Sequence, residues 1–449
     1  MKKYFIFCLI LIILCACGKT DAPLPDAVES ETAEEIAASP TIAPEDPEEV
    51  VVLDMPGFES PVEDDTTVPA SIIENMAAPP TVEGIGVTDE MLKVSVMREG
   101  NTERIKDVMR RAAKGETITL GYIGGSITAG SNADPMITNC YAYLTTLWWQ
   151  KTFPDAEFNY VNAGIGATDS YIGVHRADDD LLSFKPDLIT VEFSVNDSTE
   201  INRETYDSLL LHLLKQDNAP AVVPLIICSD SHCFVETHFP IIESYDLPAI
   251  SYYSLVFGGY VPWDKVGDPD MIHPLNPGHQ LIAHILTSFY STVLAGINDN
   301  PPGEYTVPEE HLTAVRFEHS DFLYNNDITP ISSEGFEAVH PDPPILHGDG
   351  WRTEAGGNIS FETECKSLGF AYIEYGTAPE GGCAVMNVYV DDKLFTTIDT
   401  YNENLRSDRL LYVNCVLDDS VSHHSIRFEA SPEHRNEGIF DLLGLAVSY

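Results

Sequence analysis

The sequence predicts a three-layer α/β/α domain with a five-stranded parallel sheet, followed by a C-terminal antiparallel β-sandwich. Three observations lead to this class. The chain has 449 residues, enough for two hydrophobic cores. Short apolar runs alternate with amphipathic segments over residues 87–298, as expected for parallel strands joined by helices. After Pro301 and Pro302 the helical periodicity disappears, and short alternating segments follow.

The parallel sheet is assigned to apolar, β-branched runs of strand length. We expect its strands at residues 117–123, 157–164, 187–194, 221–229 and 249–254. Helical periodicity predicts a lead-in helix at 101–114 and further helices at 141–153, 203–216, 235–245 and 279–297. Such alternation predicts a flavodoxin-like sheet over residues 87–298, with its functional groups at the carboxyl ends of the strands.

The second domain is expected over residues 305–449. Its candidate strands alternate apolar and polar residues, as half-buried strands do. They cover residues 357–364, 369–376, 384–392, 393–401, 410–419, 424–430 and 440–449. Regular spacing of such strands predicts the β-sandwich.

The N-terminus has the form of an export signal. Lys2 and Lys3 precede an apolar run that is too short to span a bilayer. The run ends in Leu-Cys-Ala-Cys at residues 14–17, which resembles the bacterial lipobox. We therefore expect residues 1–17 to be a lipoprotein signal peptide, Cys17 to carry the lipid, and the protein to face outward from the bacterial cell membrane. An ordinary secretory signal is the alternative.

Residues 18–86 are expected to form a disordered acidic tether between lipid and domain. They are rich in Pro, Glu, Asp, Ala and Thr, and Lys19 is their single basic residue. The whole chain has a formal net charge of −47, which argues against nucleic acid as a partner. Repulsion also disfavours polyanionic glycans.

Six cysteines remain beyond Cys17, too few for the framework of a small secreted domain. Cys228 and Cys233, with His232 between them, invite a zinc interpretation. Their spacing fits no standard zinc pattern and no second ligand pair is nearby, so we expect no metal.

Four strand ends carry polar side chains or glycine-rich turns. Ser126 follows the first strand in "GGSIT", and "NAGIGATDS" follows the second. Asn196 follows the third strand in "FSVND", and "DPDMIHPLNPGH" precedes the last helix. Because the carboxyl ends of parallel strands share one edge, we expect these groups to meet there.

Together these groups match the needs of acyl transfer to a serine. Asp270 and His273 are three residues apart, so one turn can bring the carboxylate to Nδ1 and leave Nε2 free for Ser126. The oxyanion donors would be the N–H groups of Ser126 and Gly166 and the amide of Asn196. Taken singly, each motif has a non-catalytic interpretation. The glycine-rich segments could be structural turns, Asn196 could cap a helix, and the segment with Asp270 and His273 could be a surface or metal-binding loop.

The segments "GGSIT", "NAGIG", "VND" and "DMIH", in this order, resemble the SGNH, or GDSL-like, hydrolase superfamily. Two positions depart from its pattern: Gly125 stands where aspartate is usual, and Val195 where glycine is usual. Gly164 is an alternative to Gly166 in the oxyanion role. The resemblance covers residues 121–297 and implies a cofactor-independent serine ester hydrolase.

Other residues near these motifs have less specific interpretations. Asp169, His175 and Arg176 are candidates for substrate contact, but a salt bridge at a helix start is favoured. His279 is expected to be a helical residue and not a second base. Trp263 is assigned with equal weight to a substrate groove and to the core.

An exported, tethered enzyme with an appended β-sandwich resembles modular carbohydrate O-acetylesterases. We therefore expect hydrolysis of O-acetyl or other short acyl esters on a carbohydrate, and the sandwich is expected to bind glycan or to shape one wall of the cleft. The alternatives are an O-acetyltransferase acting on a cell-surface glycan, a lysophospholipase-type lipase, and a non-catalytic surface binding protein.

Overall fold

The computed structural model describes residues 67–340, 346, 348–405, 408–432 and 438–449. The predicted signal peptide (1–17), the lipidation site Cys17 and the tether as far as residue 66 lie outside the described residues. In the described part of the chain, no helix is both long and apolar enough to cross a bilayer.

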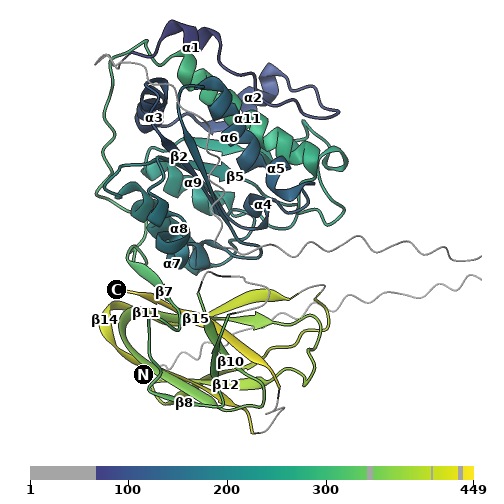
Figure 1. Ribbon diagram of the computed structural model, residues 1–449, viewed down its shortest axis with the longest axis vertical. Coiled ribbons are helices and arrows are strands. Elements are labelled where there is room, and N and C mark those ends of the chain that lie inside the picture. Colours follow the sequence, from purple (N-terminus) through teal and green to yellow (C-terminus); the bar gives the residue numbers. More distant parts are fainter. Residues whose placement is uncertain (1–66, 341–345, 347, 406–407, 433–437) are drawn as a thin grey trace, which may run out of the picture. The chain divides into compact units, whose positions relative to one another are not determined.

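A six-stranded sheet forms the centre of the first domain (Figure 1). Its five parallel strands lie in the order β3-β2-β4-β5-β6, so the predicted flavodoxin-like arrangement is confirmed. These strands are β2 (Ile118–Gly124), β3 (Phe158–Gly164), β4 (Leu188–Glu192), β5 (Ala221–Ile226) and β6 (Ala249–Ser251). The sequence prediction missed β1 (Val96–Arg98), an antiparallel edge strand, because three residues are too few to show a period.

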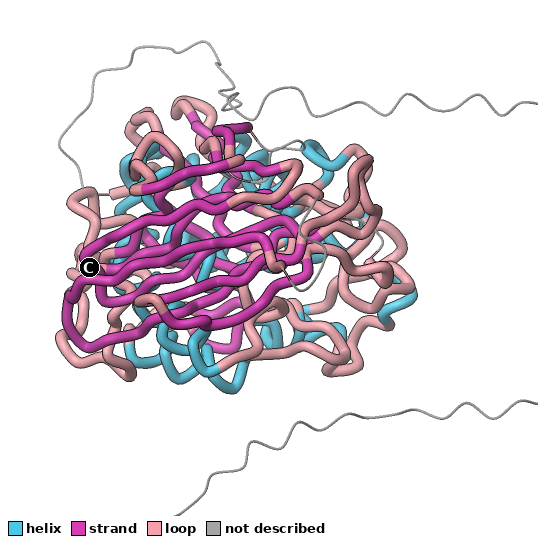
Figure 2. The backbone as a smooth tube through the Cα atoms, turned by 90° about the horizontal axis from the view of Figure 1, so that it is seen from below, coloured by secondary structure: helices cyan, strands magenta, loops and turns pink. Residues whose placement is uncertain are grey.

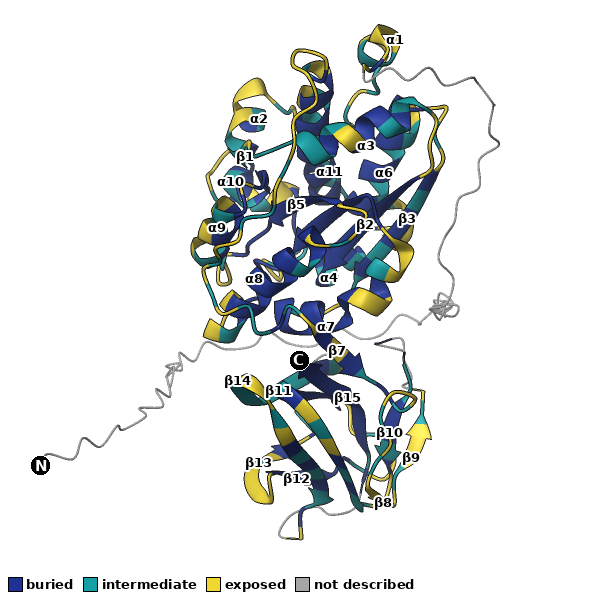
Figure 3. Ribbon diagram, turned by 90° about the vertical axis from the view of Figure 1, so that its left-hand side faces the viewer, coloured by how far each residue is buried: buried dark blue, intermediate teal, exposed yellow. Residues whose placement is uncertain are grey.

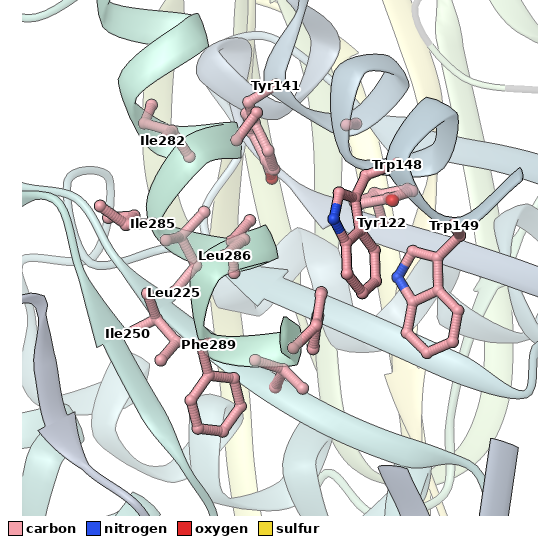
Figure 4. Close-up of a cluster of buried hydrophobic side chains, with 14 of the residues drawn as sticks. Tyr122, Tyr141, Trp148, Trp149, Leu225, Ile250, Ile282, Ile285, Leu286 and Phe289 are labelled. Atoms are coloured by element: carbon pink, nitrogen blue, oxygen red, sulfur yellow. The ribbon is translucent and has the colours of Figure 1, made fainter. Parts of the chain in front are cut away.

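Helices cover both faces of this sheet. One face packs against α3 (Glu103–Ala113), α6 (Tyr141–Thr152) and α11 (Asn276–Ala295). In this core Trp148 and Trp149 of α6 lie near Tyr122 of β2 (Figure 4). The other face packs against α7 (Ser170–Asp180), α8 (Glu200–Leu214) and α9 (Val235–Ser244). Tyr122 lies in the first of these cores and its neighbour Ile123 in the second, because successive side chains of a strand point to opposite faces of the sheet.

Residues 67–86 correct one boundary of the prediction, since this part of the expected tether packs on the first domain. Val68 and Val82 are buried there, and α1 (Ala70–Glu74) lies between them in the chain. The indole Nε1 of Trp148 donates a hydrogen bond of 2.7 Å to the carbonyl of Ala77. Composition alone missed this because a few apolar side chains, spaced irregularly among Pro, Ala and Glu, are enough to cover the ends of α6 and α11.

The second domain is an antiparallel sheet of nine strands, seen from its side of the molecule in Figure 2. Two long strands, β11 (Asn358–Glu374) and β14 (Arg409–Ala430), run through its centre, and register shifts interrupt their pairing. Residues from both halves of β11 contact one buried core, so the sheet folds around its own apolar face as a sandwich. The other strands are β7 (Ser320–Leu323), β8 (Ser332–Glu334), β9 (Glu337–Val339), β10 (Gly350–Thr353), β12 (Val385–Val390), β13 (Lys393–Asp399) and β15 (Phe440–Ser448).

The two domains share a hydrophobic core. Phe317, Phe322 and Ala446 from the second domain pack with buried residues of α7 and α8. Figure 3 shows α7 almost entirely buried where it faces this domain. Arg316 adds a paired contact, since its Nε and Nη2 donate to the two carboxylate oxygens of Glu204 in α8 at 2.9 and 2.7 Å.

Candidate active site

The predicted site lies where the strand order changes direction. β2 neighbours both β3 and β4, so the loops that follow these three strands meet at one edge of the sheet. Open parallel sheets have their ligand crevice at such a switch point. Ser126 begins the short helix α4 (Ser126–Ala129) directly after β2, and the loops after β3 and β4 bring Gly166 and Asn196 to the same crevice.

Ser126, His273 and Asp270 form one hydrogen-bonded series. The Oγ of Ser126 lies 2.8 Å from Nε2 of His273, and Nδ1 of that ring lies 2.6 Å from Oδ2 of Asp270. The other oxygen of Asp270 accepts hydrogen bonds from the backbone N–H groups of Ile272 and His273. One tight turn therefore orients the carboxylate towards the ring, as the three-residue spacing requires.

The Asp270 carboxylate is stabilised in its charged form. Partial burial raises its pKa, but the hydrogen bonds from the His273 side chain and from two backbone N–H groups outweigh burial, so the pKa of Asp270 lies below its ordinary value. An ionised carboxylate at Nδ1 fixes the ring tautomer that leaves Nε2 as the acceptor towards Ser126.

The loop that carries Asp270 and His273 is supported from behind by Trp263. The indole Nε1 donates a 2.7 Å hydrogen bond to the carbonyl of Asp268, and the ring lies where a side chain on residue 267 would project. Trp263 is absent from the lining of the crevice. Of the two interpretations left open for Trp263, the structure favours the packing one.

Gly125 permits the close approach of Asn196. A Cβ atom added to residue 125 would lie 2.4 Å from Oδ1 of Asn196, so the aspartate usual at this position in the SGNH superfamily does not fit here. The Oδ1 atom is buried and, among the described residues, has no hydrogen-bond partner. Asn196 is one of the residues that line the crevice.

The glycine that ends β3, Gly164, and the next glycine in the chain, Gly166, have different roles. The N–H of Gly164 donates to Oδ1 of Asn162 at 3.0 Å, and the N–H of Ile165 donates to the carbonyl of Gly124 at 3.1 Å. Gly164 also packs against the backbone of α4. Gly166 is different, because a Cβ atom added to it would lie 3.8 Å from the Cβ of Ser126. Of these two glycines, Gly166 is therefore the one that has Ser126 as its nearest neighbour.

Asp197, next to Asn196, is a buried residue that the sequence analysis did not single out. Its Oδ1 accepts from the N–H of Ser170 at 2.8 Å, and its Oδ2 lies 2.8 Å from Nε2 of His238 in α9. Burial raises the pKa of Asp197 to about 8 and lowers that of His238 to about 3, so we infer a neutral pair at neutral pH. This pair ties the Asn196 loop to α7 and α9.

Cys228 and Cys233 form a disulfide bond just after β5. It closes a short loop whose His232 lines the crevice, and Nδ1 of His232 lies 2.8 Å from Oγ of Ser231. In the described part of the chain, no cluster of three or more His, Cys, Asp or Glu side chains could hold a metal ion.

The remaining candidates lie behind the crevice. Asp169 caps α7 by accepting from the N–H groups of Tyr171 and Ile172. Arg176 pairs with Asp180 at 2.7 Å, as a helix salt bridge would. His279 is buried in α11, with its ring nitrogens facing the backbone of Tyr141 and Ser131, so it is a helical residue as predicted. His175 is fully buried, and burial lowers its pKa to about 4.

The second domain supplies one wall of the crevice, which is one of the two roles predicted for it. The crevice holds about 800 Å³, and Tyr375 and Arg409 of the second domain line it together with Ser126 and His273. Arg409 is fixed by Glu374, which accepts from its Nε at 2.8 Å. The hydroxyl of Tyr375 donates to Asp441. These wall residues are more than 200 positions from Ser126 in the sequence, so no local motif indicates them.

An aromatic contact fixes the orientation of this wall. Tyr412 stacks on Tyr171 of α7 with ring centroids 4.3 Å apart, and its hydroxyl donates to Oδ2 of Asp169 at 2.5 Å. Burial raises the pKa of Asp169 to about 6. The N-cap of α7 is therefore also a contact between the domains.

Comparison with known proteins supports this description. No family model matches the sequence, and neither does any curated protein. The structure is similar to two crystal structures of a two-domain esterase active on acetylated mannans, one of them co-crystallised with mannopentaose. The identity is 30% and the TM-score 0.71, and the match covers 80% of this chain and 98% of that esterase.

A smaller match is an acetyl xylan esterase from Geobacillus stearothermophilus, with 17% identity and a TM-score of 0.34 over 38% of this chain and 94% of that one. The match to the two-domain esterase spans nearly all of that protein at 30% identity, so it includes both domains. The chain therefore belongs to the family of two-domain carbohydrate esterases, carboxylic ester hydrolases of the SGNH superfamily.

Proposed function

We propose that this protein removes acetyl or similarly short acyl groups from a carbohydrate through a covalent acyl-enzyme on Ser126. The observation that carries the proposal is the 2.8 Å contact between Oγ of Ser126 and Nε2 of His273, continued to Asp270 at 2.6 Å. A hydroxyl in contact with an imidazole that a carboxylate orients can become a nucleophile at neutral pH.

In the first half-reaction, Oγ of Ser126 attacks the ester carbonyl carbon while Nε2 of His273 accepts the hydroxyl proton. The tetrahedral intermediate collapses, the bond to the sugar oxygen breaks, and His273 returns the proton to that oxygen. Asp270 stays ionised and stabilises the imidazolium that forms between these steps. The products are the free sugar hydroxyl and an acyl ester on Ser126.

Three donors are proposed to stabilise the negative oxygen of the intermediate. These are the N–H groups of Ser126 and Gly166 and the side-chain amide of Asn196. Two observations support the set: Gly166 faces the serine, and the Asn196 side chain lies between Gly125 and the crevice. The N–H groups of Gly164 and Ile165 are already engaged in the turn.

In the second half-reaction, His273 accepts a proton from a water molecule that attacks the acyl carbon. The bond to Oγ breaks, Ser126 regains its proton from His273, and the carboxylic acid leaves.

A carbohydrate is the proposed carrier of the acyl group because the crevice holds about 800 Å³ and has polar side chains on both walls. His232 lies on one wall, and Tyr375, Asp408 and Arg409 lie on the other. Hydroxyl, carboxylate and guanidinium groups suit the hydroxyls of sugars. The mannopentaose complex of the two-domain esterase supports a glycan of this type.

The test is acetate release from acetylated mannan and acetylated xylan by the full-length protein, beside its Ser126→Ala variant. p-Nitrophenyl esters from acetate to palmitate measure chain-length preference. We expect turnover on acetate and on at least one glycan, and none in the variant. Activity retained by Ser126→Ala contradicts the mechanism, preference for palmitate indicates a lipase, and acetyl transfer to an added sugar indicates a transferase.

We also propose that the protein is exported and anchored to the outer face of the cell membrane through a lipid on Cys17. The Leu-Cys-Ala-Cys sequence at residues 14–17 supports this proposal. Metabolic labelling with a fatty acid analogue tests it, because a Cys17→Ser variant should lose the label and leave the membrane fraction.

A further inference from the structure

Arg176 makes contacts that a helix salt bridge does not need. It lies in α7 with no exposed surface, and its Nη1 donates to Oδ2 of Asp180 at 2.7 Å. The same nitrogen donates to the carbonyl of Ala163 at 2.7 Å, and Nη2 donates to the carbonyl of Gly124 at 3.1 Å. One guanidinium thus joins a helix to the ends of two neighbouring strands.

These two strand ends carry the proposed oxyanion donors. Gly124 is the last residue of β2 and stands two positions before Ser126. Ala163 is next to the last residue of β3 and stands three positions before Gly166. Beyond Gly124 and Gly164 the strand pairing stops, and the N–H of Ile165 donates to the carbonyl of Gly124 at 3.1 Å, the same oxygen that Nη2 of Arg176 contacts.

A structural role alone does not account for this arginine well. Burying a guanidinium has a large desolvation cost, and an apolar side chain of similar size would fill the same space without it. The planar fork of arginine is suited to holding two acceptors at a fixed spacing. The acceptors are carbonyl oxygens at the edge of the reaction centre, where small displacements affect catalysis strongly.

We propose that Arg176 is a positioning residue, which fixes the spacing between the N–H groups of Ser126 and Gly166 so that both point at one oxyanion. This inference rests on the proposed function. Since the oxyanion forms only in the transition state, loss of the arginine should lower kcat and leave KM nearly unchanged. Removal of one oxyanion donor typically costs 10²–10³-fold in kcat, so a misplaced pair should cost about 10–100-fold.

The experiment compares Arg176→Lys and Arg176→Met with matched changes at Arg104. Arg104 also donates to two carbonyls, those of Leu214 and Pro220 at 3.0 and 3.1 Å, but it is not among the residues that line the crevice. For each full-length variant we measure kcat and KM on p-nitrophenyl acetate, the thermal midpoint, and inhibition by methylboronic acid. A boronate on Ser126 is tetrahedral and anionic, so its Ki reports oxyanion binding without turnover.

We expect kcat to fall from wild type to Arg176→Lys to Arg176→Met, with Ki rising by a similar factor and KM changing less than twofold. The Arg104 variants should lose stability and retain kcat and Ki. If Arg176→Met does not fold, Arg176→Lys decides, because unchanged kcat and Ki in that variant overturn the inference. Equal losses of kcat in the Arg104 variants also overturn it. Ser126→Ala is assayed in parallel, since activity there refutes the proposed function and not the positioning role alone.

Discussion

The side chain of Asn196 occupies the space in which a Cβ atom on residue 125 would lie, with only 2.4 Å between that position and Oδ1. Gly125 has φ −88°, a value that any residue can adopt, so the requirement for glycine comes from this contact and not from backbone conformation. The glycine at position 125, where the superfamily usually has aspartate, therefore makes room for the side chain of Asn196.

The first prediction concerns this contact. Gly125→Ala should displace the Asn196 amide, the flexible member of the pair, and lower kcat on p-nitrophenyl acetate about 10–100-fold while the protein remains folded. Gly86→Ala is the control, because an added Cβ there meets no atom within 4 Å. Wild-type kcat in Gly125→Ala would show that Asn196 does not bind the oxyanion.

The second prediction tests the role of Asp270. Asp270→Asn keeps the size of the side chain but removes its charge, so the imidazolium loses its stabilising anion and kcat should fall about 10³–10⁴-fold. Asp268→Asn is the matched control from the same loop, since Asp268 accepts from the N–H of Asp270 at 3.1 Å. A loss of kcat below tenfold in Asp270→Asn would contradict the assignment.

The third prediction concerns pH and the buried Glu192. Burial raises its pKa from 4.5 to about 8, despite hydrogen bonds from Thr128 and Gly125. Between these two values the folded protein binds more protons than the unfolded chain, so Glu192 makes the free energy of unfolding fall as pH rises from about 5 to 8.

Glu192→Gln removes this dependence. As pH rises, wild type should lose stability relative to Glu192→Gln. The measurement is the free energy of unfolding of both proteins in urea from pH 5 to 9. The exposed Glu337 provides the control change to Gln. A difference that stays constant over this pH range would mean that Glu192 remains ionised throughout.

The fourth prediction separates the two walls of the crevice. Arg409→Ala should raise KM for an acetylated mannan oligosaccharide roughly tenfold, the value of one charge-assisted hydrogen bond, and leave KM for p-nitrophenyl acetate unchanged. Arg427→Ala is the control on the same strand, because Arg427 stacks over Tyr389 and does not line the crevice. Equal KM values for the glycan in both variants would exclude Arg409 from substrate binding.

The order of the strands and the residues at their ends could be predicted because each depends on a local pattern. Ser126 and Asn196 follow apolar runs directly, and the spacing of Asp270 and His273 is that of one turn. The sequence analysis chose Gly166 as the oxyanion glycine but kept Gly164 as an alternative, because the choice depends on which N–H group the Asn162 side chain engages.

The sequence also could not predict the roles of residues that depend on contacts between distant segments. Arg409 lines the crevice, and Tyr412 on the same strand stacks on Tyr171 of α7, more than 200 positions away in the sequence. Asp197 resembles an ordinary helix cap until His238 is found beside it. Tertiary contacts of this kind leave no period or motif in a single sequence.

The hydrophobic core that the two domains share has a practical consequence for anyone who produces this protein. A fragment that stops at residue 298 would leave the apolar side chains of α7 and α8 in water, where they would promote aggregation. A fragment that starts at residue 87 would lose the cover that Val68 and Val82 provide. Soluble, active material therefore requires expression of residues 67–449 as one piece, and assays on the isolated first domain would understate what the enzyme can do.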